Sequence, residues 1–100
     1  FMAEQVLQNG ADCSGFVMSV FANFGYSLPR VAAAQCDAST KKDISHVEPG
    51  DLVFYGSGYV DHVALYIGDG KIIHASGAAT GIKISNYDYE QPAAVGTFME

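Results

Sequence analysis

The spacing of hydrophobic positions divides the chain into an N-terminal helical part and a C-terminal part rich in strands. Residues 1–8 carry a weak helical pattern, which Gly10 interrupts. From position 14 to position 24, apolar side chains recur at the spacing of a helix with one buried face. They are Phe16, Val17, Val20, Phe21 and Phe24. Asp12 is a suitable N-cap for this helix, and Gly25 is typical of the residue just beyond a helix C-terminus.

The middle of the chain predicts less regular structure. Pro29 ends the turn after the first strong helix, and residues 31–35 predict one short helix with this proline near its start. Residues 37–46 are polar, and we expect a loop there. The sequence Pro49-Gly50-Asp51 marks a turn, after which the pattern changes to that of strands.

Short β-rich runs fill the rest of the chain. Residues 52–55 form one such run, residues 82–85 alternate as a half-buried strand does, and residues 94–99 predict a closing strand. Helices that precede strands in this way favour an α+β domain with an antiparallel sheet.

The clearest prediction is a β-hairpin over residues 62–75. Two apolar runs flank the loop Gly68-Asp69-Gly70. A three-residue loop would place Ala64 opposite His74, so that His62 and His74 project from the same face of adjacent strands. A two-residue loop would put them on opposite faces, because a one-residue shift reverses every side chain. A shared face therefore requires the longer loop or a bulge with the same effect.

Composition narrows the classes of function. One hundred residues, 49% of them apolar, predict a single globular domain over residues 1–100. No apolar run approaches the roughly 20 residues that span a bilayer, so membrane insertion is not expected. Five basic against eleven acidic residues, a net charge of -6, argue against nucleic-acid binding. The chain begins at Phe1, which is compatible with a piece of a longer protein.

Cys13 is the first candidate for chemistry. It lies at the predicted start of a helix, where unpaired backbone N–H groups and the helix dipole stabilise a thiolate. The same N–H groups could donate to an oxyanion. A hydrolase would also need a base and a group that orients it, and His62 and His74 can supply both. Cys36 follows an alanine-rich stretch and is expected to be a small buried residue.

Each of these residues also has a structural interpretation. A cysteine is often only a small core residue, and a histidine that opens a strand is often structural. Two histidines could also begin a zinc site with His46, Asp61 or Cys36, but no metal-type spacing is present, and we expect neither metal nor cofactor. Only the joint placement of the cysteine and the two histidines favours catalysis.

Four motifs lie in order over residues 12–75. The first, Asp12-Cys13-Ser14-Gly15-Phe16, resembles the nucleophile motif of the NlpC/P60 peptidases. Leu28-Pro29-Arg30, with Gln35 five positions beyond the arginine, is similar to the segment that follows. Residues 49–54 are similar to the entry into the family's first strand, and residues 61–75 to its histidine hairpin.

The resemblance implies a papain-like α+β fold in which N-terminal helices pack on an antiparallel sheet. Cys13 would be the nucleophile, His62 the general base, and His74 the residue that orients the imidazole. The implied substrate is a peptidoglycan stem peptide, cut between D-glutamate and diaminopimelate or lysine. Asp12 and Ser14 would line the subsite for the N-terminal side of that peptide. Arg30 would either meet the α-carboxylate of D-glutamate or form a structural salt bridge, and the sequence favours neither.

Two other functions stay open at the level of sequence. A peptidoglycan amidase or another papain-like acyl-transfer enzyme would use the same nucleophile and base. A binding module could keep the fold without turnover. Its support is the segment before Cys13, which contains a single glycine and no tyrosine, whereas family members usually carry an aromatic, glycine-rich segment there. The implied substrate predicts a secreted or cell-envelope protein, and flanking wall-binding domains in a longer chain.

Overall fold

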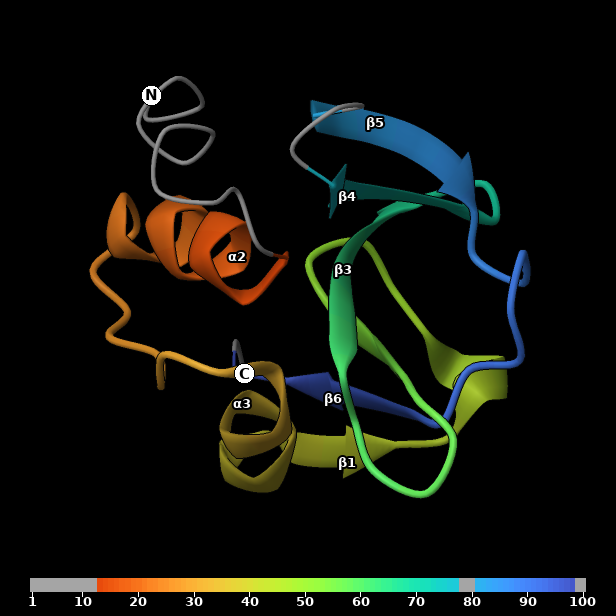
Figure 1. Cartoon of the computed structure of the whole chain (residues 1–100), viewed down its shortest axis with the longest axis horizontal. Helices are drawn as coiled ribbons and strands as arrows, with labels where there is room; N and C mark the ends of the chain where they lie inside the picture. Colours follow the sequence, from red (N-terminus) through yellow and green to blue (C-terminus); the bar gives the residue numbers. More distant parts are fainter. Residues whose placement is uncertain (1–12, 78–80, 99–100) are drawn as a thin grey trace.

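Two helices pack against one face of a curved antiparallel sheet in the computed structural model, which describes residues 13–77 and 81–98 (Figure 1). The helices are α2 (Cys13–Ala22) and α3 (Ala32–Ala38), and η1 (Ile44–His46) is one 3-10 turn. The strands are β1 (Thr40–Lys42), β2 (Leu52–Tyr55), β3 (His62–Gly68), β4 (Lys71–Gly77), β5 (Gly81–Asn86) and β6 (Ala94–Thr97). In this part of the chain the order across the sheet is β1-β6-β2-β3-β4-β5. The predicted α+β class is confirmed.

Helix α2 ends as its sequence predicts. Gly25 has a φ of 86°, in the left-handed region that glycine adopts without strain. Its N–H donates to the carbonyl of Ala22, and the N–H of Tyr26 donates to the carbonyl of Phe21. This pair of bonds is a Schellman motif, which satisfies carbonyls that the helix end would otherwise leave unpaired. Asp12, the expected N-cap, and the weak pattern over residues 1–8 lie outside the described residues.

The prediction of a polar loop over residues 37–46 is wrong. The short helix runs on to Ala38, and β1 and η1 follow it. Strand β1 pairs with β6, so Thr40 lies opposite Thr97. The side chains of β1 are polar because β1 is an edge strand of the sheet. Its partner strand, β6, lies more than fifty residues further along the chain. No local hydrophobic alternation therefore marks it.

The hairpin of β3 and β4 has the register that places both histidines on one face. A bulge gives this register, and the turn is not the three-residue loop. Leu65 lies opposite Ile73, and the register then shifts at a bulge between Tyr66 and Gly68. The turn itself holds two residues, Asp69 with a φ of 59° and Gly70 with a φ of 72°. Positive φ at both central positions is the I′ turn that matches strand twist. The extra residue in the bulge shifts the register by one position, as a three-residue turn would have done.

Alternation along β2 gives the sheet two separate cores, because all four residues of this strand are buried. The helix-side core is built on Leu52, Phe54 and Val63 under both helices, and it includes Cys13 and Cys36. The histidine-side core lies on the other face of the sheet. Its buried members are Val53, Tyr55, Ala64, Tyr66, Ile72 and Val95. His62 lies on this second face, opposite Tyr55 in the ladder.

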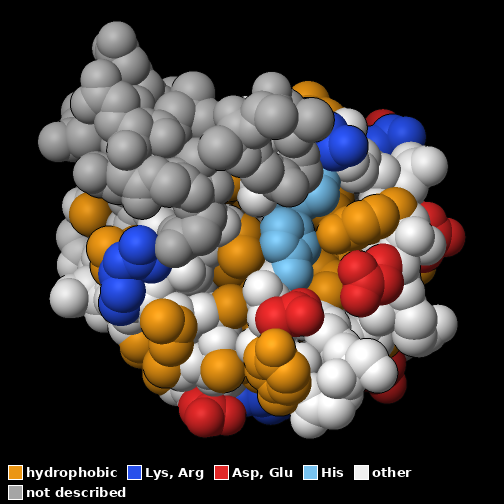
Figure 2. All heavy atoms as spheres, in the orientation of Figure 1, with side chains coloured by type: hydrophobic (Ala, Val, Ile, Leu, Met, Phe, Trp, Pro, Cys, Tyr) orange, Lys and Arg blue, Asp and Glu red, His pale blue; other side chains and the backbone are white. Residues whose placement is uncertain are grey.

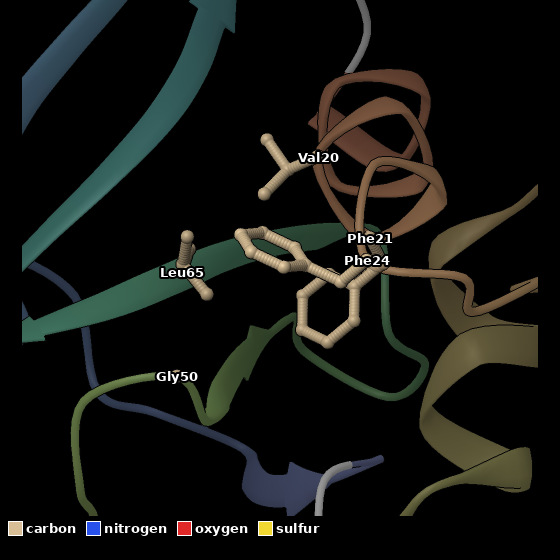
Figure 3. Close-up of a pocket in the computed structure, with 5 residues that line it drawn as sticks. All are labelled: Val20, Phe21, Phe24, Gly50 and Leu65. Carbon is tan, nitrogen blue, oxygen red and sulfur yellow. The ribbon is translucent and has the colours of Figure 1, made fainter.

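A small apolar hollow of about 210 Å³ separates the end of α2 from β3. Figure 3 shows the side chains of Val20, Phe21, Phe24 and Leu65 around it, with Gly50 at its edge. The two phenylalanines differ sharply: Phe21 is 2% exposed, whereas Phe24 is 71% exposed. Phe21 also makes edge-to-face contacts with Tyr26 and Phe98, which anchor the helix end to the core. Within the described residues, no helix is long and apolar enough to cross a membrane.

Candidate active site

Cys13 is the first residue of α2, and its thiol faces the strand that carries His62. The side chain is 8% exposed. Its Sγ atom lies 4.0 Å from the carbonyl oxygen of Asp61, the residue that precedes β3. The N–H of Asp61 donates to the carbonyl of Tyr55, which ties this point of the chain to β2. The start of the helix thus meets the start of the histidine strand at one end of the sheet.

His62 and His74 form a direct hydrogen bond between their rings. Nε2 of His62 lies 2.8 Å from Nδ1 of His74, and the rings meet edge to face with centroids 5.0 Å apart. Nε2 of His74 lies 3.0 Å from Oγ of Ser85 on β5. His62 therefore keeps Nδ1 as the ring nitrogen that His74 does not engage.

Burial favours the neutral form of both histidines. It lowers the pKa of His62, an effect that the negative charges of Glu90 and Asp61 oppose. It lowers the pKa of His74 to about 4, with further contributions from His62 and Lys83. His74 is 1% exposed. At neutral pH it is an uncharged imidazole with one donor and one acceptor nitrogen.

Two tyrosines enclose the histidine pair. Tyr55 is fully buried, its ring centroid lies 5.8 Å from that of His62, and its hydroxyl donates to the carbonyl of Tyr87. Tyr89 follows β5, and its ring lies 5.5 Å from His74 and 5.2 Å from Tyr55. Burial raises the pKa of Tyr89, and the charges of Glu90, Cys13 and Asp61 add to this shift.

A second network holds the first turn of α2. Nη1 of Arg30 donates to Oγ of Ser14, at 3.2 Å. The amide nitrogen of Gln35 donates to the carbonyls of Ser14 and Pro29, at 3.1 and 2.8 Å. The segment after the helix is thereby fastened to the residue that follows Cys13.

The structure brings most of the expected site residues together. His62 and His74 are in contact, Cys13 lies beside the residue before His62, and Ser14 is joined to Arg30. Asp12 lies outside the described residues. Cys36 is buried in the helix-side core and, like Cys13, forms no disulfide. His46 is exposed, and no group of three or more potential metal ligands occurs within residues 13–77 and 81–98.

Sequence reasoning missed Ser85 and Tyr89. Ser85 was only the last position of an alternating strand, and its approach to His74 depends on the register between β4 and β5, in which His74 faces Lys83 and Ile72 faces Ser85. That register shifts between Ala75 and Gly77, which no local pattern reveals. Tyr89 lies in a segment without regular spacing. Its one signal was an aromatic residue among acidic neighbours.

His62 is only partly buried, so the site reaches the molecular surface. Figure 2 shows histidine side chains reaching the surface near the middle of one face of the molecule, with acidic side chains beside them. Asp61 and Glu90 are both exposed, and their charges act on His62. The side chains that flank the histidines therefore carry negative charge.

The fold and this arrangement define a papain-like α+β domain, and comparison with known proteins gives the family. The sequence matches the model of the NlpC/P60 family over residues 4–97. The chain belongs to the NlpC/P60 family.

Individual relatives agree with this assignment. The probable endopeptidase p60 of Listeria innocua is 46% identical over 90 residues, which cover 88% of this chain and 18% of that protein. The gamma-D-glutamyl-L-lysine dipeptidyl-peptidase of Bacillus subtilis is 40% identical over 79 residues, covering 75% of this chain and 27% of that protein. The solved structure of the peptidoglycan hydrolase RipB from Mycobacterium tuberculosis superposes with a TM-score of 0.82 at 36% identity, covering 89% of this chain and 45% of that one. The chain thus spans less than a third of the length of these two curated relatives.

Proposed function

We propose that this domain is a cysteine endopeptidase that hydrolyses peptidoglycan stem peptides, with Cys13 as nucleophile, His62 as general base and His74 as the residue that orients the base. The observation that carries the proposal is the 2.8 Å contact between Nε2 of His62 and Nδ1 of His74, beside a thiol at a helix start. Such a thiol, a base and an orienting group are the parts that nucleophilic catalysis by cysteine requires.

The chemistry follows from the placement of each group. The thiol proton of Cys13 passes to Nδ1 of His62, which leaves a thiolate at the N-terminus of α2, where backbone N–H groups stabilise negative charge. The thiolate attacks the scissile carbonyl, and the imidazolium then gives its proton to the leaving amine. Water hydrolyses the resulting thioester, with His62 acting again as base.

The bond we propose is that between D-glutamate and diaminopimelate or lysine. The Bacillus subtilis relative is a gamma-D-glutamyl-L-lysine dipeptidyl-peptidase, and RipB is a peptidoglycan hydrolase. Asp12 and Ser14 would line the subsite for the N-terminal side of the stem peptide. Arg30 would meet the α-carboxylate of D-glutamate, and its bond to Ser14 would hold the guanidinium at that subsite.

This substrate implies a cellular location for the protein. Peptidoglycan lies outside the cytoplasm, so we propose a thiol protease that is secreted or held in the cell envelope. Residues 1–100 would form one catalytic domain, and the short share of each curated relative that it covers supports flanking domains that bind the wall.

Mass spectrometry of purified muropeptides, incubated with the protein and with Cys13→Ala, tests the proposal. We expect fragments split after D-glutamate with the unmutated protein, and none above background with Cys13→Ala. His62→Ala should behave like Cys13→Ala, whereas Cys36→Ala, which removes the other buried thiol, should leave the fragments unchanged.

Other outcomes would reassign the domain. Cleavage between the glycan and L-alanine would make it an amidase. Binding of muropeptides without any product would make it a binding module, a function that the joined histidines beside Cys13 do not favour. Equal product from the protein and from Cys13→Ala would remove Cys13 as nucleophile.

A further inference from the structure

We infer that Ser85 is a positioning residue of the active site, because its hydroxyl fixes the tautomer of His74 and, through it, the tautomer of His62. The inference rests on the proposed function for its kinetic consequence. The structural observation is a chain of two contacts, from Nε2 of His62 to Nδ1 of His74 at 2.8 Å and from Nε2 of His74 to Oγ of Ser85 at 3.0 Å.

The proton positions along this chain are linked. A neutral imidazole has one protonated and one bare nitrogen, and its two partners determine which is which. If Nε2 of His74 donates to the Ser85 hydroxyl, then Nδ1 of His74 is the acceptor. Nε2 of His62 must in turn be the donor, so its Nδ1 is bare and can take a proton.

The opposite arrangement would be inactive. If His74 carried its proton on Nδ1, it would donate to Nε2 of His62, and the neutral His62 would then hold its proton on Nδ1. That nitrogen could not accept the thiol proton of Cys13. The imidazolium of His62 would also lose its partner, since two N–H groups would then face each other across 2.8 Å.

The sheet places Ser85 for this role. His74 faces Lys83 and Ile72 faces Ser85 in the ladder between β4 and β5, so Ser85 and His74 lie diagonally on one face. Ser85 is half-buried, and His74 is almost completely buried. A hydroxyl can accept from the His74 N–H or donate to a bare Nε2. We assign the accepting role to Ser85, because only that direction leaves Nδ1 of His74 bare to accept from Nε2 of His62.

The neighbouring charges agree with a neutral His74. The groups that act on it are His62 from β3 and Lys83 from β5, and both disfavour a second proton. The groups that act on His62 are Glu90 and Asp61, which favour the imidazolium there. The charge that develops during catalysis therefore resides on His62, while His74 stays neutral and passes no proton onward.

Nitrogen NMR of the histidine rings tests the inference without any need for activity. In the protein and in Ser85→Thr, which keeps the hydroxyl, we expect His74 with its proton on Nε2 and a bare Nδ1 at neutral pH. In Ser85→Ala we expect a mixture of both tautomers at His74 and at His62. Exposed Ser45→Ala, on η1, is the matched control and should leave both rings unchanged.

Steady-state cleavage of the stem peptide gives the second readout. Ser85→Ala should lower kcat about tenfold, the effect of one hydrogen bond, and leave KM within about twofold, whereas Ser85→Thr should restore kcat. A single Nε2–H tautomer at His74 in Ser85→Ala would overturn the inference, as would Nδ1–H in the unmutated protein. An unchanged kcat in Ser85→Ala would also overturn it. If even the unmutated protein cleaves nothing, the proposed function fails, while the tautomers still decide the role of Ser85.

Discussion

The amide nitrogen of Gln35 donates to the carbonyl of Ser14, across 21 positions of sequence, and so fastens α3 to the first turn of the cysteine helix. Gln35 is completely buried, and its Oε1 has no hydrogen-bond partner among the described residues. Its second bond, to the carbonyl of Pro29, holds the residue before Arg30. One side chain therefore positions both the nucleophile turn and the arginine.

Gln35→Met should destabilise the fold by about 1–3 kcal/mol, because it removes both bonds while keeping an unbranched chain of similar volume. Gln35→Glu should cost more, since a carboxylate would lie buried against two carbonyl oxygens. Urea unfolding at neutral pH measures both changes. Equal stability of the protein and both variants would show that the two bonds contribute nothing.

The ring of Tyr89 should protect the histidine pair from water. It lies 5.5 Å from the ring of His74 and is itself 49% exposed, so it separates a buried imidazole from solvent. In Tyr89→Ala, water would reach the pair, the pKa of His74 should rise towards its ordinary value, and kcat should fall severalfold. Tyr89→Phe keeps the ring and should match the unmutated protein. A loss in Tyr89→Phe as large as in Tyr89→Ala would assign the effect to the hydroxyl instead. Histidine titration by NMR and the rate of stem-peptide cleavage provide the comparison.

Stability should fall as the medium is acidified, in the window set by His74. Its pKa is about 4 in the folded protein against an ordinary value of 6.5, so between these values the unfolded chain binds more protons. The contribution of His74 is fully present above pH 6.5 and is lost as the pH falls towards 4, by up to about 3 kcal/mol. Urea unfolding at several pH values should show a shallower dependence for His74→Asn. A slope identical to that of the unmutated protein would contradict the low pKa.

The hairpin and the central strand could be predicted because their determinants are local. Residues 52–55 and the two runs beside Asp69 are apolar and bounded by glycine, and each forms the strand expected. The shared face of His62 and His74 was predicted on the condition of a three-residue loop or a bulge with the same effect, and the bulge meets that condition. The sequence could not show which feature sets that register, because a bulge between Tyr66 and Gly68 and a longer turn give the same pairing.

The parts that escaped prediction depend on contacts distant in sequence. The pairing of Thr40 with Thr97 and the approach of Ser85 to His74 arise only once the sheet has assembled. The same holds for Tyr89, which reaches the histidines from a segment without periodicity. Polar and aromatic side chains in such places carry no spacing that would distinguish a site residue from a surface one.

Two phenylalanines that line the same hollow should differ in how much their substitution destabilises the fold. Phe21 is buried between α2 and the sheet, so Phe21→Leu should destabilise the fold by about 1–2 kcal/mol through lost contacts. Phe24 lines the same hollow but is mostly exposed, and Phe24→Leu should change the free energy of unfolding by less than about 0.5 kcal/mol. Chemical denaturation measures both, and similar losses for the two variants would show that the hollow is closed over Phe24 in solution.

The division of the sheet into two cores has a consequence for how such an enzyme can change. The thiol belongs to the helix-side core, whereas His62 and the contacts of His74 belong to the other face of the sheet. Substitutions beneath α2 would therefore move the sulfur while the imidazole pair stays in place. Substitutions around Tyr55 would change the base strength of the imidazoles while the sulfur stays in place. Nucleophile placement and base strength are separately adjustable quantities in this fold, so evolution or engineering can alter one without rebuilding the other.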